Sequence, residues 1–234
     1  MQHLLKDSDL SKAQIEALIA LGKSVKADPK KYGQALAGKS VVTLFEKPSL
    51  RTRVTFDIGI ARLGGHSVYL DQQNGALGKR EAVKDFAANL SRWCDAIVAR
   101  VFDHQTLVEL AEHGSVPVVN SLCNLYHPCQ GLADFMTISE HYSDLSKVKL
   151  AYLGDGNNVS HSLLLLGATL GTDVTLVCPT ALARTLRSSC RPRRWRRNLA
   201  RPSTSAMTWA PSKALTWFIP TPGSPWVTTH QWSR

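Results

Sequence analysis

The chain has 234 residues, of which 44% are hydrophobic, so it can bury the core of one large domain or of two small ones. Its apolar runs are too short to span a bilayer, its first residues lack the form of a secretion signal, and five cysteines without a C-x-x-C pair predict a reduced, cytoplasmic protein. The formal net charge of +10 is an uneven average, because only the last part of the chain is basic.

Strand-like and helix-like segments alternate as far as Thr180. The series begins with Leu10–Ala27, which has apolar residues at helical spacing. Short β-branched runs predict strands at Ser40–Phe45, Ser67–Leu70, Ala96–Ala99, Val116–Asn120, Val148–Leu153 and Asp173–Cys178. Longer runs predict helices at Thr52–Leu63, Arg80–Cys94, Gln105–Glu112, Gln130–Tyr142 and Ser160–Leu170. This alternation indicates an α/β fold with parallel sheets flanked by helices, in which ligands bind at the carboxyl ends of the strands.

A domain boundary is predicted within or just after the helix Gln130–Tyr142, because the polar stretch Ser143–Lys147 then leads into a new strand. Residues 1–142 are therefore expected to form one domain and residues 143–180 the start of a second. One strand–helix–strand unit buries too little apolar surface to stand alone.

The composition changes abruptly after Thr180. Residues 1–180 hold 18 Lys and Arg against 18 Asp and Glu, whereas residues 181–234 hold 10 Lys and Arg and no acidic residue. The same segment contains five of the six Trp and six of the eleven Pro. Residues 181–234 are therefore a basic tail, rich in Trp and Pro, that differs from the balanced sequence before it.

The first candidate site is the run Ser49-Leu50-Arg51-Thr52-Arg53, between a short apolar strand and an amphipathic helix. A helix start offers unpaired backbone N–H groups and the positive end of the helix dipole. Two hydroxyls and two guanidinium groups placed there form a cradle suited to phosphate. The alternative interpretation is a capped helix start with solvated arginines.

Two further candidates lie at strand ends. Arg100 closes the strand Ala96–Ala99, where it is either functional or simply exposed. His127 precedes Pro128-Cys129-Gln130 at a helix start, which lowers the affinity of an imidazole for a proton. A neutral imidazole there could donate a hydrogen bond to a carbonyl oxygen, whereas the alternative is an ordinary helix start with proline in its first turn. Cys129 is not expected to be a nucleophile activated by His127, because the side chains of residues two apart on a helix point in different directions.

The loop Gly154–Ser162 follows a predicted strand and superficially resembles a dinucleotide-binding turn. Its spacing is not G-x-G-x-x-G, since no third glycine follows Gly156 in this loop, so a Rossmann cofactor site is rejected. The adjacent carboxamides of Asn157 and Asn158 are suited instead to a zwitterionic ligand. The sequence has neither zinc-type nor dicarboxylate metal spacing.

These motifs and their order resemble ornithine carbamoyltransferase, within the aspartate/ornithine carbamoyltransferase superfamily. The resemblance covers essentially residues 1–180 and rests on F-E-K-P-S-L-R-T-R, A-R at a strand end, Y-H-P-C-Q-x-L-A-D and G-D-G-N-N-V-x-H-S. Aspartate carbamoyltransferases are similar in the first and third motifs but carry a more basic loop in place of Asn157-Asn158. An aspartate carbamoyltransferase-like enzyme is therefore the alternative.

The resemblance implies a two-domain α/β enzyme, usually a homotrimer or a multiple of trimers, with active sites shared between subunits. It implies transfer of the carbamoyl group from carbamoyl phosphate to the side-chain amine of L-ornithine, giving L-citrulline and phosphate. This reaction serves arginine biosynthesis or catabolism. No cofactor, metal or membrane is implied.

Carried over position by position, the carbamoyl phosphate site of the family maps onto three of the motifs. The expected binding residues are Ser49, Leu50, Arg51, Thr52, Arg100, His127, Pro128, Cys129 and Gln130. Arg100 would bridge the phosphate and the carbonyl oxygen, and with His127 and Thr52 it would stabilise the charge that develops on that oxygen. Asn158 would bind the α-amino acid end of ornithine.

The loop Gln72–Glu81 matches the segment that reaches into the neighbouring subunit's site in this family. The family often has a glutamine where this chain has Ala76, and Lys79 or Arg80 could supply charge there instead. The resemblance therefore implies a site completed by a second copy of the chain.

The resemblance ends at Thr180. Members of the family continue with a D-x-W-x-S-M-G loop and an H-C-x-P loop, and the chain contains neither. Codons for Phe218–Thr228 can be written so that a shift of one base gives V-Y-T-D-T-W-V-S-M-G-D. Residues from about Ala181 onward are therefore expected to be a frameshifted translation, non-native or disordered, which leaves the second domain incomplete.

The tail also permits other interpretations. Arg191–Arg201 surrounds Trp195 with arginines, a composition compatible with a nucleic-acid-binding arm. A GC-rich frameshift yields the same residue types without selection, so nucleic acid is not the expected partner. A catalytically dead fragment that binds carbamoyl phosphate or phosphate is the remaining alternative. Little or no turnover is expected from the 234 residues themselves.

Overall fold

A computed structural model describes residues 2–71, 77, 81–177 and the strand 217–220. The described residues form two parallel sheets, with strand orders β2-β1-β3-β4 and β6-β5-β7. The strands are β1 (Ser40–Phe45), β2 (His66–Asp71), β3 (Ala96–Arg100), β4 (Val118–Leu122), β5 (Lys149–Leu153), β6 (Asp173–Val177) and β7 (Trp217–Pro220). The helices are α1 (Lys12–Ala27), α2 (Leu50–Arg62), α3 (Val83–Trp93), α4 (His104–His113), α5 (Pro128–His141) and α6 (Asn158–Leu170).

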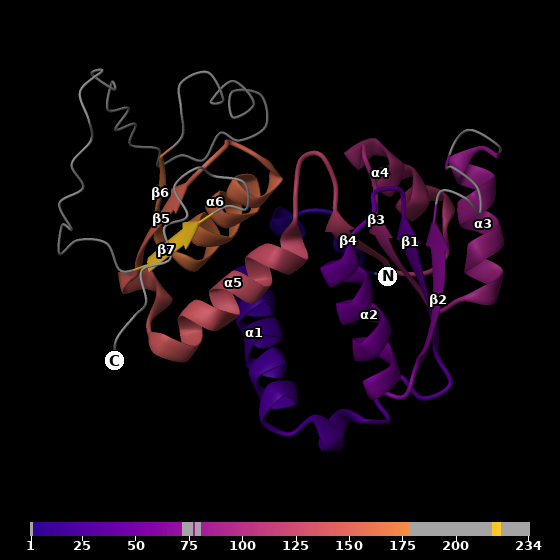
Figure 1. Ribbon diagram of the computed structural model, residues 1–234, viewed down its shortest axis with the longest axis horizontal. Helices are drawn as coiled ribbons and strands as arrows, with labels where there is room; N and C mark the ends of the chain where they lie inside the picture. The colour runs from indigo at the N-terminus through magenta and orange to yellow at the C-terminus, as the bar shows by residue number, and fades with distance from the viewer. Residues whose placement is uncertain (1, 72–76, 78–80, 178–216, 221–234) are drawn as a thin grey trace.

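Helices cover both faces of the first sheet (Figure 1). Val42 and Leu44 of β1 join the apolar cluster that includes α3 and α4, whereas Val41 packs with Ile60 of α2. Alternate residues of one strand therefore serve opposite faces, as expected for a sheet buried on both sides. The fold class predicted from the alternation of segments is confirmed.

The second core joins elements from distant parts of the chain. Most of its buried residues come from α1, α5, β5 and α6, and Ile15, Phe135, Tyr152 and Leu163 are fully buried there. Helices α1 and α5 lie side by side (Figure 1). Helix α5 was assigned from sequence to the first domain, and its buried face packs in the core around β5.

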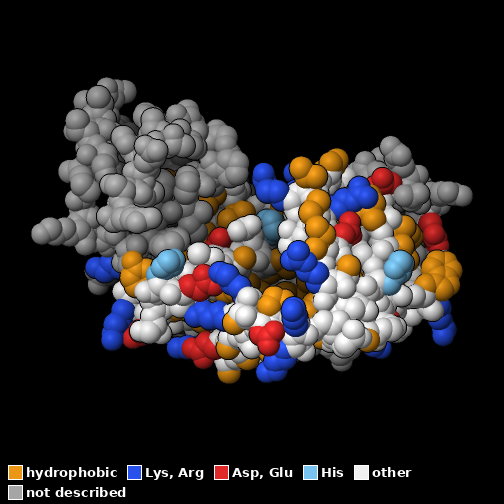
Figure 2. All heavy atoms as spheres, turned by 60° about the horizontal axis from the view of Figure 1, so that its bottom comes forward, with side chains coloured by type: hydrophobic (Ala, Val, Ile, Leu, Met, Phe, Trp, Pro, Cys, Tyr) orange, Lys and Arg blue, Asp and Glu red, His pale blue; other side chains and the backbone are white. Residues whose placement is uncertain are grey.

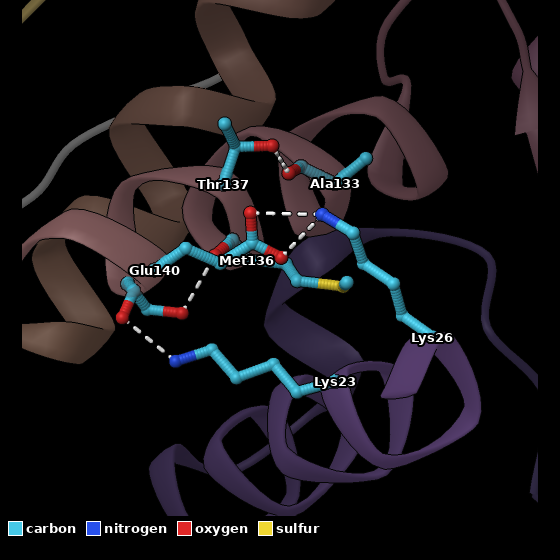
Figure 3. A network of polar contacts seen from close by, with 7 residues as sticks. Lys23, Lys26, Ala133, Met136, Thr137 and Glu140 are labelled. Carbon is cyan, nitrogen blue, oxygen red and sulfur yellow. Dashed lines mark hydrogen bonds and ion pairs between the residues drawn. The ribbon is translucent and has the colours of Figure 1, made fainter. Parts of the chain in front are cut away.

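A polar network also joins α1 to α5 (Figure 3). Lys26 Nζ contacts both carboxylate oxygens of Glu140 at 2.8 and 2.9 Å, and Lys23 Nζ donates to the carbonyl of Ser139 at 2.7 Å. Exposed ion pairs of this kind contribute little to stability, so the apolar contacts beneath them hold the two helices together.

The exposed surface in this region carries both signs of charge. Figure 2 shows Lys and Arg interspersed with Asp and Glu on one face of the molecule. This mixture agrees with the equal numbers of basic and acidic residues in residues 1–180. No helix in the described ranges is long and apolar enough to cross a membrane.

Several boundaries differ by a few residues from those predicted, and three of these shifts have a clear local cause. Helix α2 begins at Leu50 rather than at Thr52, because the Ser49 hydroxyl caps it. Helix α5 begins at Pro128, since the fixed φ of proline suits the first helical position. Strand β4 begins at Val118, because Pro117 cannot donate to the ladder.

One short segment of the tail lies within the described ranges. Residues 217–220, which were expected to be non-native or disordered with the rest of residues 181–234, form β7, which pairs in parallel with Leu150–Leu153 of β5. The sequence Trp-Phe-Ile has a high strand propensity, and β5 offers an unpaired edge for it. The rest of the tail, including Arg191–Arg201, lies outside the described residues.

Candidate functional site

Three strand ends meet at one edge of the first sheet. Phe45, the last residue of β1, pairs with Arg100 of β3, and Arg100 pairs with Leu122 of β4. The register between β3 and β4 shifts between Ala99 and Arg100, and irregularities of this kind redirect a side chain. The loops that leave these strands carry the first three candidate motifs.

Ser49 and Thr52 form the capped start of α2. The Ser49 backbone is extended, with φ of −159°, and its hydroxyl lies 3.4 Å from the Thr52 amide and 3.0 Å from the Thr52 hydroxyl. Leu50, at the first helical position, is 79% exposed, and Arg51 is exposed beside it. The first turn of α2 therefore presents backbone N–H groups of Leu50 and Arg51 that no residue within the helix can satisfy.

Arg100 links this helix start to the neighbouring strand. Its Nε donates to the carbonyl of Lys47 at 3.1 Å, and its Nη1 lies 3.5 Å from Thr52 Oγ1. Burial lowers the pKa of the guanidinium, but arginine remains charged at any pH at which proteins work. A permanent positive charge is thus fixed beside two hydroxyls and a helix N-terminus.

Arg53 does not belong to this cradle, contrary to the prediction that two guanidinium groups would form it. Its Nε lies 3.5 Å from Asp57 Oδ2, and its guanidinium stacks 3.5 Å from the centre of the Tyr69 ring. Arg53 lies one position beyond Thr52 on the helix, and this shift turns it toward β2. Arg53 therefore fastens α2 to the sheet.

His127 precedes α5 and carries an unpaired buried nitrogen. Among the described residues nothing bonds to its Nδ1, although its backbone N–H donates to Ser162 Oγ at 2.9 Å. Burial, and after it the charge of Arg100, lowers the pKa of His127 to about 4. The imidazole is therefore neutral near pH 7, and burial rather than the helix terminus is the main cause.

Gln130 and Cys129 occupy the first turn of α5. Gln130 Nε2 donates to Asp134 Oδ1 at 2.8 Å, which leaves the amide oxygen free to accept from a ligand N–H. Cys129 Sγ donates to the carbonyl of Asn120 at 3.4 Å, and burial raises the pKa of this thiol to about 12. A thiol held protonated in this way is not a nucleophile.

The two asparagines lie at the start of α6, across from the end of β4. Asn157 caps the helix, because its Oδ1 accepts from the amides of Val159 and Ser160 at 3.0 and 3.2 Å. Asn158 Nδ2 donates to the carbonyl of Cys123 at 2.7 Å. The Asn158 bond joins the start of α6 to the segment that follows β4.

Both carboxamides line a pocket of about 240 Å³. The other lining residues are Lys47, Val101, Phe102, Leu122, Cys123 and Asn124. Lys47 and Phe102 were not assigned a role from the sequence, although Lys47 lies within the motif F-E-K-P-S-L-R-T-R and Phe102 follows Arg100 by two residues. Phe102 is 52% exposed and lies under the Lys47 ammonium, so the pocket has an apolar wall and a positive group.

Ala76, Lys79 and Arg80 lie outside the described residues, so the structure does not test them. In the described part of the chain, no group of three or more His, Cys, Asp or Glu is arranged to hold a metal ion. The predicted residues that the structure brings together are Ser49, Thr52, Arg100 and His127, with Asn158 at the neighbouring pocket.

Comparison with known proteins places this arrangement in a family. Residues 2–140 match the carbamoyl-P binding domain of aspartate/ornithine carbamoyltransferase, and residues 146–198 match its Asp/Orn binding domain. The chain belongs to the aspartate/ornithine carbamoyltransferase family. The family assignment agrees with the resemblance carried by the four motifs.

Individual relatives of this family are similar over the same part of the chain. The ornithine carbamoyltransferases of Vibrio sp. (strain 2693) and Moritella abyssi are each 74% identical over 179 residues, which is 76% of this chain and 60% of theirs. The solved ornithine carbamoyltransferase of Pyrococcus furiosus is 43% identical with a TM-score of 0.75, over 77% of this chain and 58% of that one. The chain therefore spans about 60% of the length of the relatives it matches.

Proposed function

We propose that this chain carries the carbamoyl phosphate half of an ornithine carbamoyltransferase site. The contact of Arg100 with the Thr52 hydroxyl is the observation that carries the proposal, because it joins the start of α2 to the end of β3. The charge of Arg100 also lowers the pKa of His127, so the motif that begins with His127 lies close to the same guanidinium. Carbamoyl phosphate has a phosphate, a bridging oxygen and a carbonyl oxygen side by side, and it needs hydrogen-bond donors grouped around all three.

Each group has a role in the proposed transfer. The amine of ornithine attacks the carbonyl carbon, a C–N bond forms, and negative charge develops on the carbonyl oxygen. Arg100, Thr52 and neutral His127 donate to that oxygen, and losing one such donor typically costs about 2.7–4 kcal/mol. The C–O bond to phosphate then breaks, and the amine proton leaves with the phosphate. Alignment of the two reactants supplies much of the remaining rate.

Ornithine is the proposed second substrate. The pocket beside the cradle offers two carboxamides and an apolar wall, which suit a zwitterionic amino acid with an alkyl chain. The relatives reported above are named ornithine carbamoyltransferases, which favours ornithine over aspartate. The cytoplasm and arginine biosynthesis, as compartment and pathway, are parts of the same proposal.

A homotrimer or a multiple of trimers is the proposed assembly. Leu50, Val54 and Ile58 of α2 are 79%, 44% and 47% exposed and follow one another at intervals of four residues. Such a row lies on one helix face, and an exposed apolar row next to a ligand site supports contact with another protein surface. A second copy on this face would bring its own residues close to the cradle.

Binding of carbamoyl phosphate tests the proposal for this site directly. We expect freshly prepared carbamoyl phosphate to bind the purified chain in isothermal titration calorimetry and to be displaced by inorganic phosphate. Acetyl phosphate lacks the NH₂ group that the Gln130 oxygen would accept from, so we expect it to bind more weakly. Absence of binding at millimolar carbamoyl phosphate would overturn the proposed function.

We further propose that the sequence from about Ala181 onward is an out-of-frame translation. The change in composition at Thr180 and the 179-residue extent of the 74% identity support it. The match to the Asp/Orn binding domain continues to residue 198, beyond Thr180, and does not favour the proposal. The absence of acidic residues from 181 onward favours it. We expect sequencing of the gene to show a one-base change near the Thr180 codon, and citrulline formation to appear once the frame is restored. An intact frame whose bases do not regroup would contradict this.

A further inference from the structure

A buried carboxylate lies beside the candidate site and has no role in the proposed chemistry. Asp7 belongs to the short helix η1 (Asp7–Asp9), before α1, and is only 1% exposed. Its Oδ2 accepts from the hydroxyl of Ser162 at 2.6 Å, and Ser162 on α6 is fully buried. Asp7 Oδ1 has no partner among the described residues.

Ser162 is bonded on its other side to the candidate site. Its Oγ accepts from the backbone N–H of His127 at 2.9 Å. A hydroxyl has one hydrogen to donate, so the carboxylate of Asp7 fixes the direction of the O–H bond and turns a lone pair toward His127. His127 is the N-cap residue of α5, and the partner of its backbone N–H comes from Ser162 on α6 rather than from α5 itself.

Helices α5 and α6 are in close contact beside Ser162. A Cβ added to Gly131 of α5 would lie 2.6 Å from Leu166 Cδ1 and 3.3 Å from Ser162 Cβ. The two helices approach each other here as closely as a glycine allows. A displacement of Ser162 would therefore be transmitted to the first turn of α5.

Stability alone does not explain a carboxylate in this place. Burial raises the pKa of Asp7 to about 6, which means that the charged form is disfavoured where it lies. Within the described ranges no ion pair involves Asp7. A buried charge without a cation costs free energy, and the bond that this carboxylate accepts from Ser162 fixes the direction of the Ser162 O–H group.

We propose that Asp7 and Ser162 are positioning residues that hold His127 in its place in the carbamoyl phosphate site. This inference rests on the proposed function for the role of His127 toward the ligand, but the link itself exists without a ligand. Residues 7, 127 and 162 come from three separate parts of the chain. The link therefore also fixes α6, and with it Asn157 and Asn158, relative to α5.

Hydrogen exchange of the unliganded 234-residue chain tests the link. In Ser162→Ala we expect the His127 amide to exchange roughly tenfold faster than in the parent, in keeping with the loss of one buried hydrogen bond. Thr172→Val is the matched control, because it removes another buried hydroxyl, bonded to the Leu145 carbonyl at 2.8 Å, and should leave the His127 amide unchanged. An unchanged His127 amide in Ser162→Ala overturns the inference.

Ligand affinity separates positioning from a general loss of stability. We expect Ser162→Ala to weaken binding of carbamoyl phosphate by roughly tenfold, whereas Thr172→Val should lower the melting temperature without weakening it. Equal weakening in both variants, or none in Ser162→Ala, overturns the role in positioning. If the parent chain does not bind carbamoyl phosphate, the proposed function fails, and the exchange experiment alone decides whether Ser162 holds His127.

Discussion

Arg100→Met is expected to weaken carbamoyl phosphate binding by on the order of 100-fold, because it removes a charge-assisted hydrogen bond from a partly buried site. Arg100 is held by the Lys47 carbonyl and reaches the Thr52 hydroxyl, so its guanidinium is already oriented before a ligand arrives. Methionine preserves much of the side-chain volume and leaves the phosphate without this counter-charge. Calorimetric titration of the parent and the variant measures the difference.

Two further variants make this test specific. Arg100→Lys keeps the charge but not the planar fork, so we expect an intermediate loss of affinity. Arg53→Met removes a guanidinium four residues from Ser49 that is bound to Asp57 and Tyr69, so affinity should remain close to that of the parent. Equal losses in Arg53→Met and Arg100→Met would show that general positive charge, rather than the cradle, attracts the ligand.

The same variant has a second readout at His127. The charge of Arg100 contributes to the lowered pKa of this imidazole, so removing it should raise the pKa toward the ordinary value. Titration of the ring by NMR measures the shift in the absence of ligand. An unchanged pKa would mean that the two side chains are farther apart in solution than the structure places them.

Local sequence patterns were sufficient to predict most of the fold. Apolar periodicity located each helix and strand up to residue 177, and a glycine follows the last residues of α2 and α6. Gly64 and Gly171 both have φ of +85°, a conformation that residues with a Cβ rarely adopt. The short-range capping of α2 by Ser49 was likewise visible as a hydroxyl before an amphipathic run.

Long-range contacts could not be predicted in this way. Asp7 and Ser162 are 155 residues apart, and no local pattern indicates that a carboxylate near the N-terminus will be buried against α6. Arg53 was expected in the cradle, but adjacent residues on a helix point about 100° apart, and only the position of β2 places Arg53 against Asp57 and Tyr69. The pocket residues Lys47 and Phe102 come together only through the pairing of β1 with β3.

Asp7→Asn is expected to change stability in opposite directions at neutral and acidic pH. The folded-state pKa of Asp7 is about 6 against 3.8 for the free group, so near pH 7 both folded and unfolded chains carry the charge and only the folded chain bears the cost of burying it. Removing the charge should therefore raise the free energy of unfolding by up to about 3 kcal/mol near pH 7. The new NH₂ group has no partner at the place of Oδ1, which costs about 1–2 kcal/mol. The expected net gain near pH 7 is therefore about 1–2 kcal/mol.

Acidification reverses the sign of the difference in stability between Asp7→Asn and the parent. As pH falls below about 6, the folded parent takes up a proton at Asp7 before the unfolded chain does, so the parent gains stability until both are protonated below 3.8. At that point only the cost of the unpartnered NH₂ remains, and Asp7→Asn should be the less stable protein. His127 titrates in the opposite direction, losing stability as pH falls from 6.5 toward about 4, but it is present in both proteins and cancels in the difference.

Urea unfolding of Asp7→Asn and the parent, at neutral pH and again below the pKa of the free carboxyl, measures whether the difference in their free energies of unfolding changes sign. Asp173→Asn changes an exposed carboxylate on β6 and serves as the control, for which we expect little change in stability at either pH. A difference between Asp7→Asn and the parent that keeps one sign across the range would show that Asp7 is not buried as a charged group. In that case hydration of the carboxylate would have to reach the interior between η1, α5 and α6, and the tight contact at Gly131 leaves little room for water there.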